Sequence, residues 1–269
     1  MATHGSAFPI AKLALNNNVP PILMASLRMG MVMLLLIPFW KFKIPDKKYL
    51  KSLILFSISM GVMVYVFMNL SLKHSSFISP IIIGAQLAVP FAVLLSAKMI
   101  GESISPKKWM YVILAFVGII IVFFDPELKN NLLGLFFASL MALFFAIAQV
   151  YSRQLKELSL IILNVYTGFF GFLVLIVVSF FVEGEVIINI KNINFESWIL
   201  ISYQAVIVSL FAHMSMFYLY KFYTVGQIFP FYSLFPIFGI ILTFFILIIT
   251  SPSTKKDTTI RTKKPKKPV

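Results

Sequence analysis

Residues 159–182, SLIILNVYTGFFGFLVLIVVSFFV, form an apolar stretch without a charged side chain. A helix needs roughly 20 such residues to cross the hydrocarbon core of a bilayer. Seven further stretches are long and apolar enough: 20–40, 51–72, 76–99, 108–124, 132–151, 197–219 and 226–249. A ninth, from Gly5 to Leu15, is shorter and contains Lys12. Because the stretches are continuous and not alternating, they predict helices and not a membrane barrel. We expect an all-α integral membrane protein, a bundle of about nine transmembrane helices.

The composition also indicates a lipid environment. Of the 269 residues, 60% are hydrophobic and 12% are charged, whereas a soluble domain has about 25% charged and 45–50% apolar residues. Too little polar surface is present to cover a water-soluble globule. Cysteine is absent, which excludes disulfides, thiolate nucleophiles and Cys-ligated metal or iron–sulfur centres. The three histidines are not at metal-ligand spacing. We expect no metal and no cofactor.

The net charge of +14 does not indicate nucleic-acid binding, because the basic residues stand in short loops and in one tail. They orient the helices instead. If the 41–51 connection is cytoplasmic, the loops on that side carry Lys41, Lys43, Lys47, Lys48, Lys51, Lys98, Lys107, Lys108, Arg153, Lys156 and Lys221. The loops on the opposite side carry Lys12, Lys73, Lys129 and Lys191. The N-terminus is then cytoplasmic, and the basic tail 250–269 falls on the side where basic residues are not expected.

Two weak internal similarities divide the chain into halves. The segment from His4 to Lys12 is similar to the segment from Phe145 to Arg153, and Ser79-Pro80 opens one span as Phe229-Pro230 opens another. Inverted repeats are typical of secondary transporters, which bind substrates at discontinuous helices near the bilayer midplane. The two similarities together indicate two halves, each opening with a helix that ends in a basic residue.

Several motifs follow one another along the chain: Gly5-Ser6-Ala7-Phe8 with Lys12-Leu13-Ala14-Leu15, Val19-Pro20-Pro21, Leu27-Arg28, Ser75-Ser76-Phe77-Ile78-Ser79, Ile100-Gly101-Glu102-Ser103-Ile104-Ser105 and Phe229-Pro230-Phe231-Tyr232-Ser233-Leu234-Phe235-Pro236. In this order the chain resembles the EamA-type permeases of the drug/metabolite transporter superfamily. The resemblance implies ten helices in two inverted five-helix repeats. It also implies transport of small metabolites, often amino-acid derivatives, across the inner membrane.

The resemblance further implies a domain organisation. A first EamA-like repeat is expected over 1–125 with its first helix shortened, a second over 132–249 without its last helix, and a basic polar tail over 250–269. The expected tenth helix is missing because the sequence becomes polar and basic near Ser251-Pro252, where Gly101-Glu102 would recur. A truncated, transport-inactive relic of a permease is therefore an alternative to an active transporter.

Arg28 is a candidate for the substrate pathway because it lies inside an apolar span. A charged residue there normally faces a partner or an aqueous cavity, although it can also snorkel to the interface. Gln86 lies between Pro80 and Pro90, where freed backbone carbonyls indicate either a substrate site in a broken helix or an interhelical hydrogen bond. In the second half the arrangement recurs with Pro230, Tyr232 and Pro236.

His213 lies in the middle of a span, where it could relay protons or simply pack with a hydrogen bond. Gly101 and Glu102 form a cytoplasmic turn, in which the carboxylate is expected to face the N-terminus of the next helix and to pair with a nearby lysine. Further polar residues within spans could line a pore: Asn69, Gln149, Asn164, Tyr203 and Gln204.

These observations favour a secondary transporter of small metabolites, a multi-pass protein of the bacterial inner membrane. An intramembrane enzyme is disfavoured, since the acidic residues stand at helix ends and no catalytic constellation is visible. No Walker-type motif for ATP hydrolysis occurs. Without a carboxylate deep in a span, exchange or facilitated diffusion fits better than proton coupling. The expected partners are the lipid bilayer, a small-molecule metabolite and, as a possible homodimer, a second copy of the chain.

Overall fold

The computed structural model describes residues 2–41, 44–124, 131–232 and 234–249, and these are helical throughout except for turns and connections. Six helices are long and apolar enough to cross a membrane: Pro21–Phe39, Lys47–Lys73, Ile78–Ile100, Leu132–Gln154, Leu160–Val182 and Phe195–Leu219. Each coincides with a predicted span to within four residues. Two shorter apolar helices cover Trp109–Gly118 and Phe235–Ile246. The prediction of a helical, multi-pass membrane protein is confirmed, whereas the count of about nine spans is not.

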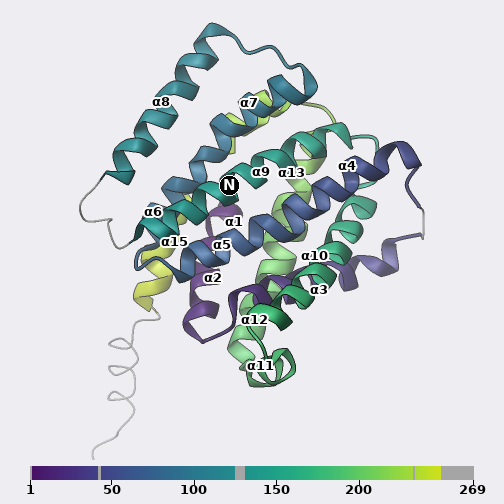
Figure 1. Cartoon of the computed structure of the whole chain (residues 1–269), viewed down its shortest axis with the longest axis vertical. Coiled ribbons are helices and arrows are strands. Elements are labelled where there is room, and N and C mark those ends of the chain that lie inside the picture. Colours follow the sequence, from purple (N-terminus) through teal and green to yellow (C-terminus); the bar gives the residue numbers. More distant parts are fainter. Residues whose placement is uncertain (1, 42–43, 125–130, 233, 250–269) are drawn as a thin grey trace, which may run out of the picture.

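The helices follow one another along the chain (Figure 1): α1 (Ala2–Gly5), α2 (Ala7–Asn16), α3 (Pro21–Leu36), η1 (Ile37–Phe39), α4 (Lys47–Ile58), η2 (Ser59–Met63), α5 (Val64–Lys73), α6 (Ile78–Gly84), η3 (Ala85–Leu87), α7 (Ala88–Ile100), α8 (Pro106–Phe123), α9 (Leu132–Gln154), α10 (Leu160–Val182), α11 (Val186–Asn192), α12 (Phe195–Tyr203), η5 (Gln204–His213), α13 (Met214–Leu219), α14 (Val225–Tyr232) and α15 (Phe235–Ile249). The segments η1 and η3 are 3₁₀-helices, whereas η2 and η5 are π-helices within longer helices.

Prolines mark the beginnings of several helices. Pro21 is the first residue of α3, Pro80 and Pro90 lie in the first turns of α6 and α7, and Pro236 is the second residue of α15. A proline is tolerated there because the first N–H groups of a helix have no partner within the helix. The 3₁₀ turn η3 thus separates two helical segments, each with a proline near its beginning.

Glycines allow α3, η2 and α10 to cross closely. A Cβ atom on Gly168 would lie 2.9 Å from the backbone nitrogen of Met33, and one on Gly61 would lie 2.7 Å from the carbonyl oxygen of Thr167. The helices α3 and α10 lie side by side over much of their length (Figure 1). Membrane helices associate through such close backbone packing, because burial of apolar surface gives no advantage in lipid.

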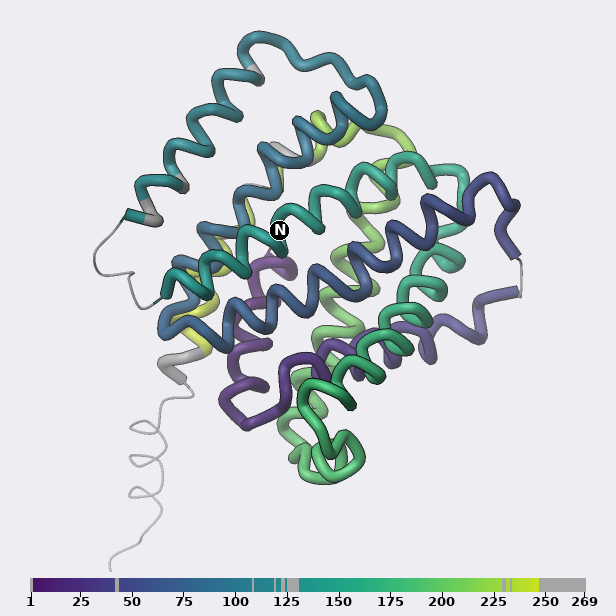
Figure 2. The backbone as a smooth tube through the Cα atoms, viewed as in Figure 1, coloured from purple at the N-terminus to yellow at the C-terminus, as the bar shows by residue number. Residues whose placement is uncertain are grey.

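The first segment of the chain lies inside the bundle. Helices α1 and α2, purple in Figure 2, pack against α5, α12 and α15. Gly5 stands so close to α15 that a Cβ atom on it would lie 2.6 Å from the backbone nitrogen of Gly239. Because His4, Ala7 and Phe8 are buried, the side chains of this short segment become part of the protein interior.

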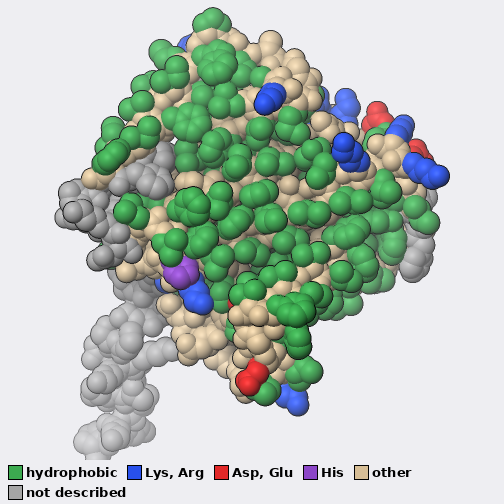
Figure 3. Space-filling model, viewed as in Figure 1, with side chains coloured by type: hydrophobic (Ala, Val, Ile, Leu, Met, Phe, Trp, Pro, Cys, Tyr) green, Lys and Arg blue, Asp and Glu red, His purple; other side chains and the backbone are tan. Residues whose placement is uncertain are grey.

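The surface fits a membrane-embedded bundle. On the face shown in Figure 3, hydrophobic side chains cover the middle, and charged side chains gather toward the upper right and the bottom. Helix α8 lies at one side of the bundle (Figure 1), where it packs on α7 and exposes large apolar side chains such as Ile113 and Ile121. The basic tail 250–269 lies outside the described residues.

Gly101 ends α7 in the left-handed region, with φ 77°. Its N–H donates to Ala97 O at 3.1 Å, and the N–H of Glu102 donates to Ser96 O at 3.3 Å, which satisfies carbonyls at the helix end. We expect Gly101→Val to lower the stability by about 1–2 kcal/mol through backbone strain, and Gly101→Asn to cost less. Since a Cβ atom there meets nothing within 4 Å, steric clash does not contribute. Thermal unfolding in detergent measures the difference, and equal melting temperatures for the two variants would contradict it.

Candidate functional site

Arg28 lies in the protein interior with 3% of its surface exposed. Its guanidinium donates from Nε to Ser209 Oγ at 2.9 Å, from Nη1 to Gln204 Oε1 at 2.7 Å and from Nη2 to the Tyr65 hydroxyl at 3.4 Å. The guanidinium carbon also lies 4.1 Å from the centre of the Tyr65 ring, a cation–π distance. Arg28 therefore does not snorkel to the interface.

The partners of Arg28 are themselves held in place. Gln204 donates from Nε2 to the carbonyl of Ala7 at 2.6 Å, so its Oε1 must face Arg28. The hydroxyls of Tyr65 and Ser209 lie 3.4 Å apart. Among the described residues no carboxylate hydrogen-bonds to Arg28. A guanidinium remains protonated in proteins, so the partners that the described residues offer to this buried positive charge are polar and not anionic.

Helix α3, which carries Arg28, is anchored at its N-terminus. The Glu183 carboxylate at the end of α10 accepts from the backbone N–H groups of Ile22 and Leu23 at 2.7 and 2.8 Å, and from Ser179 Oγ at 2.7 Å. A carboxylate at this position satisfies otherwise unpaired N–H groups and interacts favourably with the helix dipole. Together with the close crossing of α3 and α10 at Gly168, this contact fixes the position of Arg28 along the axis of the bundle.

A cavity of about 30 Å³ lies beside Arg28, which is room for one or two water molecules. Its walls are mainly aromatic and apolar: His4, Ala7, Phe8, Arg28, Val64, Tyr65, Met68, Ala85, Met141, Phe145, Val208, His213 and Tyr232. The walls come from both halves of the chain, since α1, α2, α3, α5 and η3 precede residue 125 and α9, η5 and α14 follow it.

Two histidines meet at this cavity. The rings of His4 and His213 stand edge to face with their centroids 4.7 Å apart, and His4 also meets the ring of Tyr232 at 5.4 Å. Two buried ring nitrogens, His4 Nε2 and His213 Nδ1, have no hydrogen-bond partner. Unpaired polar atoms in the interior are costly and uncommon, so these two nitrogens are available to a ligand or to water.

Three of the four residues predicted for the substrate pathway, Arg28, His213 and Tyr232, line this cavity. Gln86 does not line it, although its neighbour Ala85 does. The side-chain nitrogen of Gln86 is buried without a hydrogen-bond partner. Pro230 lies within α14, and its side chain is not among those described.

Glu102 lies away from the cavity and makes a different contact from the one predicted. Its Oε2 accepts from the backbone N–H of Gly226 at 3.4 Å. Gly226 belongs to the first turn of α14, so the carboxylate faces the N-terminus of a helix in the second half and not that of α8, the next helix. The contact joins the two halves of the chain at this end of the bundle.

Sequence reasoning did not select His4, Tyr65 or Ser209. A signal for His4 was present, because the internal similarity aligns His4 with Phe145, and both residues line the cavity. No pattern in the sequence marks η5, the π-helix that carries Gln204, Ser209 and His213. Such helices often occur at functional sites.

Most of the other polar residues considered for a pore have hydrogen-bond partners within the protein, away from Arg28. Asn69 donates to Pro21 O at 2.8 Å, Asn164 to Leu160 O at 2.8 Å, and the Tyr203 hydroxyl lies 2.8 Å from Ser6 Oγ. Gln149 is fully buried, and both its side-chain oxygen and nitrogen lack a hydrogen-bond partner. Of the residues in this group, only Gln204 contacts Arg28.

The arrangement suits the binding of a small anion. Within the described part of the chain no group of three or more His, Cys, Asp or Glu side chains could hold a metal ion. The site instead combines a guanidinium that has no carboxylate partner among the described residues with two unpaired imidazole nitrogens and aromatic walls. A buried charge normally requires an opposite charge or dense hydrogen bonding, and a bound carboxylate would supply that charge.

Comparisons with known proteins bear on the fold and the family. The sequence model of the EamA-like transporter family matches residues 1–124 and again residues 132–254. No curated protein matches the chain. Among solved structures, one described only as "Crystal structure of protein" has a TM-score of 0.58 and 15% identity, and the alignment covers 93% of this chain and 86% of that one. At this identity the likeness concerns the fold alone.

Proposed function

The chain belongs to the EamA-like transporter family, and on that premise we propose that it is a secondary transporter of small metabolites that carry a carboxylate. In this proposal Arg28 binds the carboxylate, while His4, His213 and Tyr232 contact the rest of the molecule. The membrane is the bacterial inner membrane. Residues 1–124 and 132–254 move relative to each other around the cavity during alternating access.

The observation that carries this proposal is the buried Arg28, which has no carboxylate partner among the described residues. Ionisable residues at membrane depth are costly, and they mark substrate or ion pathways. The cavity beside Arg28 lies between the two family-matched segments, where transporters built from repeats place their substrates. Its volume of about 30 Å³ is too small for a metabolite, which fits a closed state from which either side must open.

We propose exchange or facilitated diffusion as the mode of transport. None of the described residues that line the cavity is an acid, so a coupled proton would have to be carried by His4 or His213 and not by a carboxylate. Enzymatic activity is not proposed, because the cavity contains no nucleophile paired with a base.

Counterflow in proteoliposomes tests the proposal. Purified protein is reconstituted in vesicles that contain a set of unlabelled small carboxylates, and uptake of trace labelled carboxylate is compared with uptake of the corresponding neutral amide. We expect uptake of at least one carboxylate above the level of protein-free vesicles and no uptake of its amide. Such uptake would also exclude a transport-inactive relic. Equal uptake of acid and amide would contradict the role of Arg28 in binding the carboxylate. No uptake of any carboxylate would contradict the proposed substrate class.

Gln204→Glu provides a prediction within the site. One oxygen of the new carboxylate would lie where Gln204 Oε1 lies, 2.7 Å from Arg28 Nη1. It would form an ion pair with the guanidinium and so compete with the carboxylate of the substrate. The substitution also removes the donation from Gln204 Nε2 to the Ala7 carbonyl, so the folding of the variant is checked by its melting temperature. We expect it to bind a carboxylate substrate at least about tenfold more weakly, because a charge pair of this kind is worth about 1.5 kcal/mol or more. The KM for counterflow measures the effect. The control is Gln154→Glu, which makes the same substitution at an exposed position. Gln149→Glu is not suitable, since it would bury a new charge. A KM unchanged in Gln204→Glu would contradict the role of Arg28 as the anion-binding residue.

A further inference from the structure

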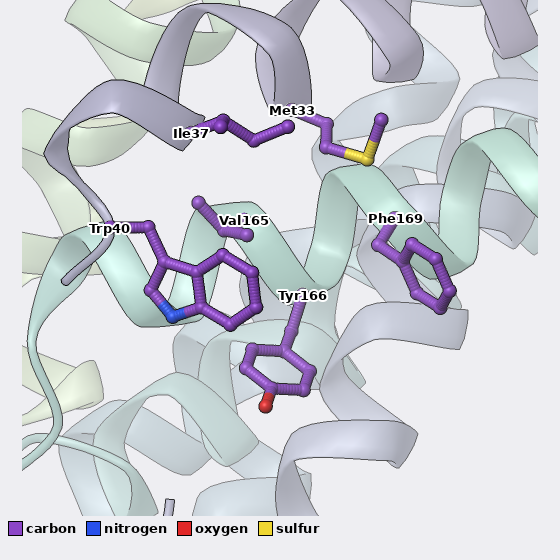
Figure 4. A pocket seen from close by; sticks show the side chains of 6 residues that line it. All are labelled: Met33, Ile37, Trp40, Val165, Tyr166 and Phe169. Atoms are coloured by element: carbon purple, nitrogen blue, oxygen red, sulfur yellow. The ribbon is translucent and has the colours of Figure 1, made fainter. Parts of the chain in front are cut away.

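An apolar groove lies between α3 and α10, away from the arginine cavity. It has a volume of about 370 Å³ and is lined by Met33, Ile37, Trp40, Val165, Tyr166 and Phe169. Figure 4 shows Met33 and Ile37 on one wall, with Val165, Tyr166 and Phe169 on the α10 helix opposite and the Trp40 indole at one end. The groove opens to the surface, since Phe169 is 45% exposed.

A second, smaller cavity continues the groove toward the end of the bundle. Its volume is about 190 Å³, and it is lined by Phe39, Trp40, Lys41, Ser159, Ile161 and Ile162. Trp40 lines both cavities, with its ring edge to face against Tyr166 at 5.8 Å between centroids. The two cavities thus adjoin at the Trp40 side chain, and together we call them the surface channel: its larger part is lined by apolar side chains, and its smaller part includes a lysine and a serine.

The position of the channel relative to the membrane follows from its residues. Tryptophan is enriched at the level of the lipid headgroups, and Trp40 stands where the apolar helix ends and Lys41 begins the polar connection. The apolar part of the channel is therefore at the depth of the acyl chains, and Lys41 is at the depth of the headgroups. An unfilled groove in the hydrocarbon region would lose packing contacts, so an acyl chain is the matching occupant.

We propose that the surface channel binds an anionic phospholipid. One acyl chain lies along Met33, Ile37, Val165 and Phe169 in the larger cavity, and the headgroup phosphate lies at Lys41 in the smaller one. Basic pockets between membrane helices on the cytoplasmic side bind anionic headgroups, and the distribution of basic residues predicts that Lys41 faces the cytoplasm. The proposal does not depend on transport activity or on its substrate.

The charges of the connection between Lys41 and α4 are mostly positive, with Asp46, which interacts with Lys48, as the acidic residue among the described ones. Lys47, Lys48 and Lys51 follow in the first turns of α4, all exposed. The acidic residue of the α9–α10 connection, Glu157, accepts a hydrogen bond from the Tyr49 hydroxyl and interacts with Lys48 and Lys156. Its charge is thus already balanced, and Lys41 remains exposed beside the channel.

Quenching of Trp40 fluorescence by brominated lipids tests the proposal. The chain has three tryptophans, so Trp109→Phe and Trp198→Phe leave Trp40 as the single reporter in the full-length protein. This protein is reconstituted in phosphatidylcholine vesicles with increasing amounts of brominated phosphatidylglycerol, and in a second series the bromine is carried by phosphatidylcholine. Bromine on an acyl chain quenches only at close range, so quenching at a given mole fraction gives the relative affinity of each lipid for the channel.

We expect phosphatidylglycerol to occupy the channel about fivefold more strongly than phosphatidylcholine, the factor that one lysine contributes near an anionic lipid. Lys41→Ser should reduce this preference to about one, and Lys41→Arg should keep it. Lys98→Ser is the matched control, because Lys98 is also exposed and predicted to be cytoplasmic but lines neither cavity; it should keep the preference. Equal quenching by both lipids, or an unchanged preference in Lys41→Ser, would overturn the proposal. Absence of quenching by either lipid would overturn it as well, since no acyl chain would then lie beside Trp40.

Discussion

Arg28→Ala is expected to reduce carboxylate counterflow at least about 30-fold. The substitution removes the one charged side chain among the described residues that line the cavity, and a charged group that pairs with a buried partner is worth about 2–5 kcal/mol. Arg28→Lys is also expected to lose counterflow, to a rate within a few-fold of that of Arg28→Ala. Three hydrogen bonds leave the guanidinium in separate directions, to Ser209, Gln204 and Tyr65, and an ammonium cannot reproduce them together with the stacking on Tyr65.

Arg153 offers a matched control for the lysine substitution. It donates from Nη1 to the carbonyl of Tyr220, a single contact that an ammonium can remake. Arg153→Lys is therefore expected to keep counterflow within about twofold of the original protein. Measurement of transport at equal amounts of reconstituted protein separates loss of function from loss of expression. If Arg28→Lys transports as well as the original protein, charge alone suffices and the proposed geometry of recognition is wrong; if Arg28→Ala does so too, Arg28 is not part of the substrate site.

Gly168→Val is expected to prevent stable folding. Its new Cβ atom would lie 2.9 Å from Met33 N and 3.0 Å from Met29 O. Because these are backbone atoms of α3, rotation of a side chain cannot relieve the clash, and the two helices must separate. Overpacking of a well-packed interior costs about 1–3 kcal/mol and sometimes more, and we expect more than about 3 kcal/mol here because α3 and α10 are in contact along much of their length.

Gly118→Val is the control for this prediction, because a Cβ atom on Gly118 of α8 meets nothing within 4 Å. Both substitutions add the same apolar side chain to a membrane helix. The yield of monodisperse protein after detergent extraction, followed by thermal unfolding, compares them. Normal yield and melting temperature for Gly168→Val would show that α3 and α10 do not cross as closely as described. An equal loss in Gly118→Val would mean that helix propensity, and not the crossing, causes the effect.

The sequence predicted the class of protein and the positions of most helices for a simple reason. Charges are so costly in hydrocarbon that each crossing must be a continuous apolar run, and such runs are visible without any structure. Residues 159–182 and 132–151 were therefore predicted almost to their ends as α10 and α9. The segment 226–249 was predicted as one span, whereas the structure has α14 and α15 there, with Pro236 at the beginning of the second.

Arg28 could be selected from the sequence because a charge inside an apolar run is conspicuous. Of its partners, Gln204 was indicated only as one of several polar residues within spans, and Ser209 and Tyr65 were not indicated at all, because uncharged polar residues are common in these spans. His4 and His213 are separated by most of the chain, and neither has a neighbour in sequence that predicts the 4.7 Å contact between their rings. Gln86, selected because of its prolines, is not part of the cavity, since the side chain at a helix interruption faces whichever neighbour the packing supplies.

The distribution of apolar and charged residues along the chain thus identified a helical membrane protein, located most of its helices and pointed to the buried charge that requires an explanation. The three-dimensional structure was needed to show that α1 lies in the interior, that η5 brings Gln204, Ser209 and His213 to Arg28, and that Glu102 contacts α14. The difference arises because transfer into lipid depends on the composition of each segment alone. The contacts of a side chain depend instead on how helices cross, and in lipid those crossings are set by small residues and backbone proximity, which no single segment encodes.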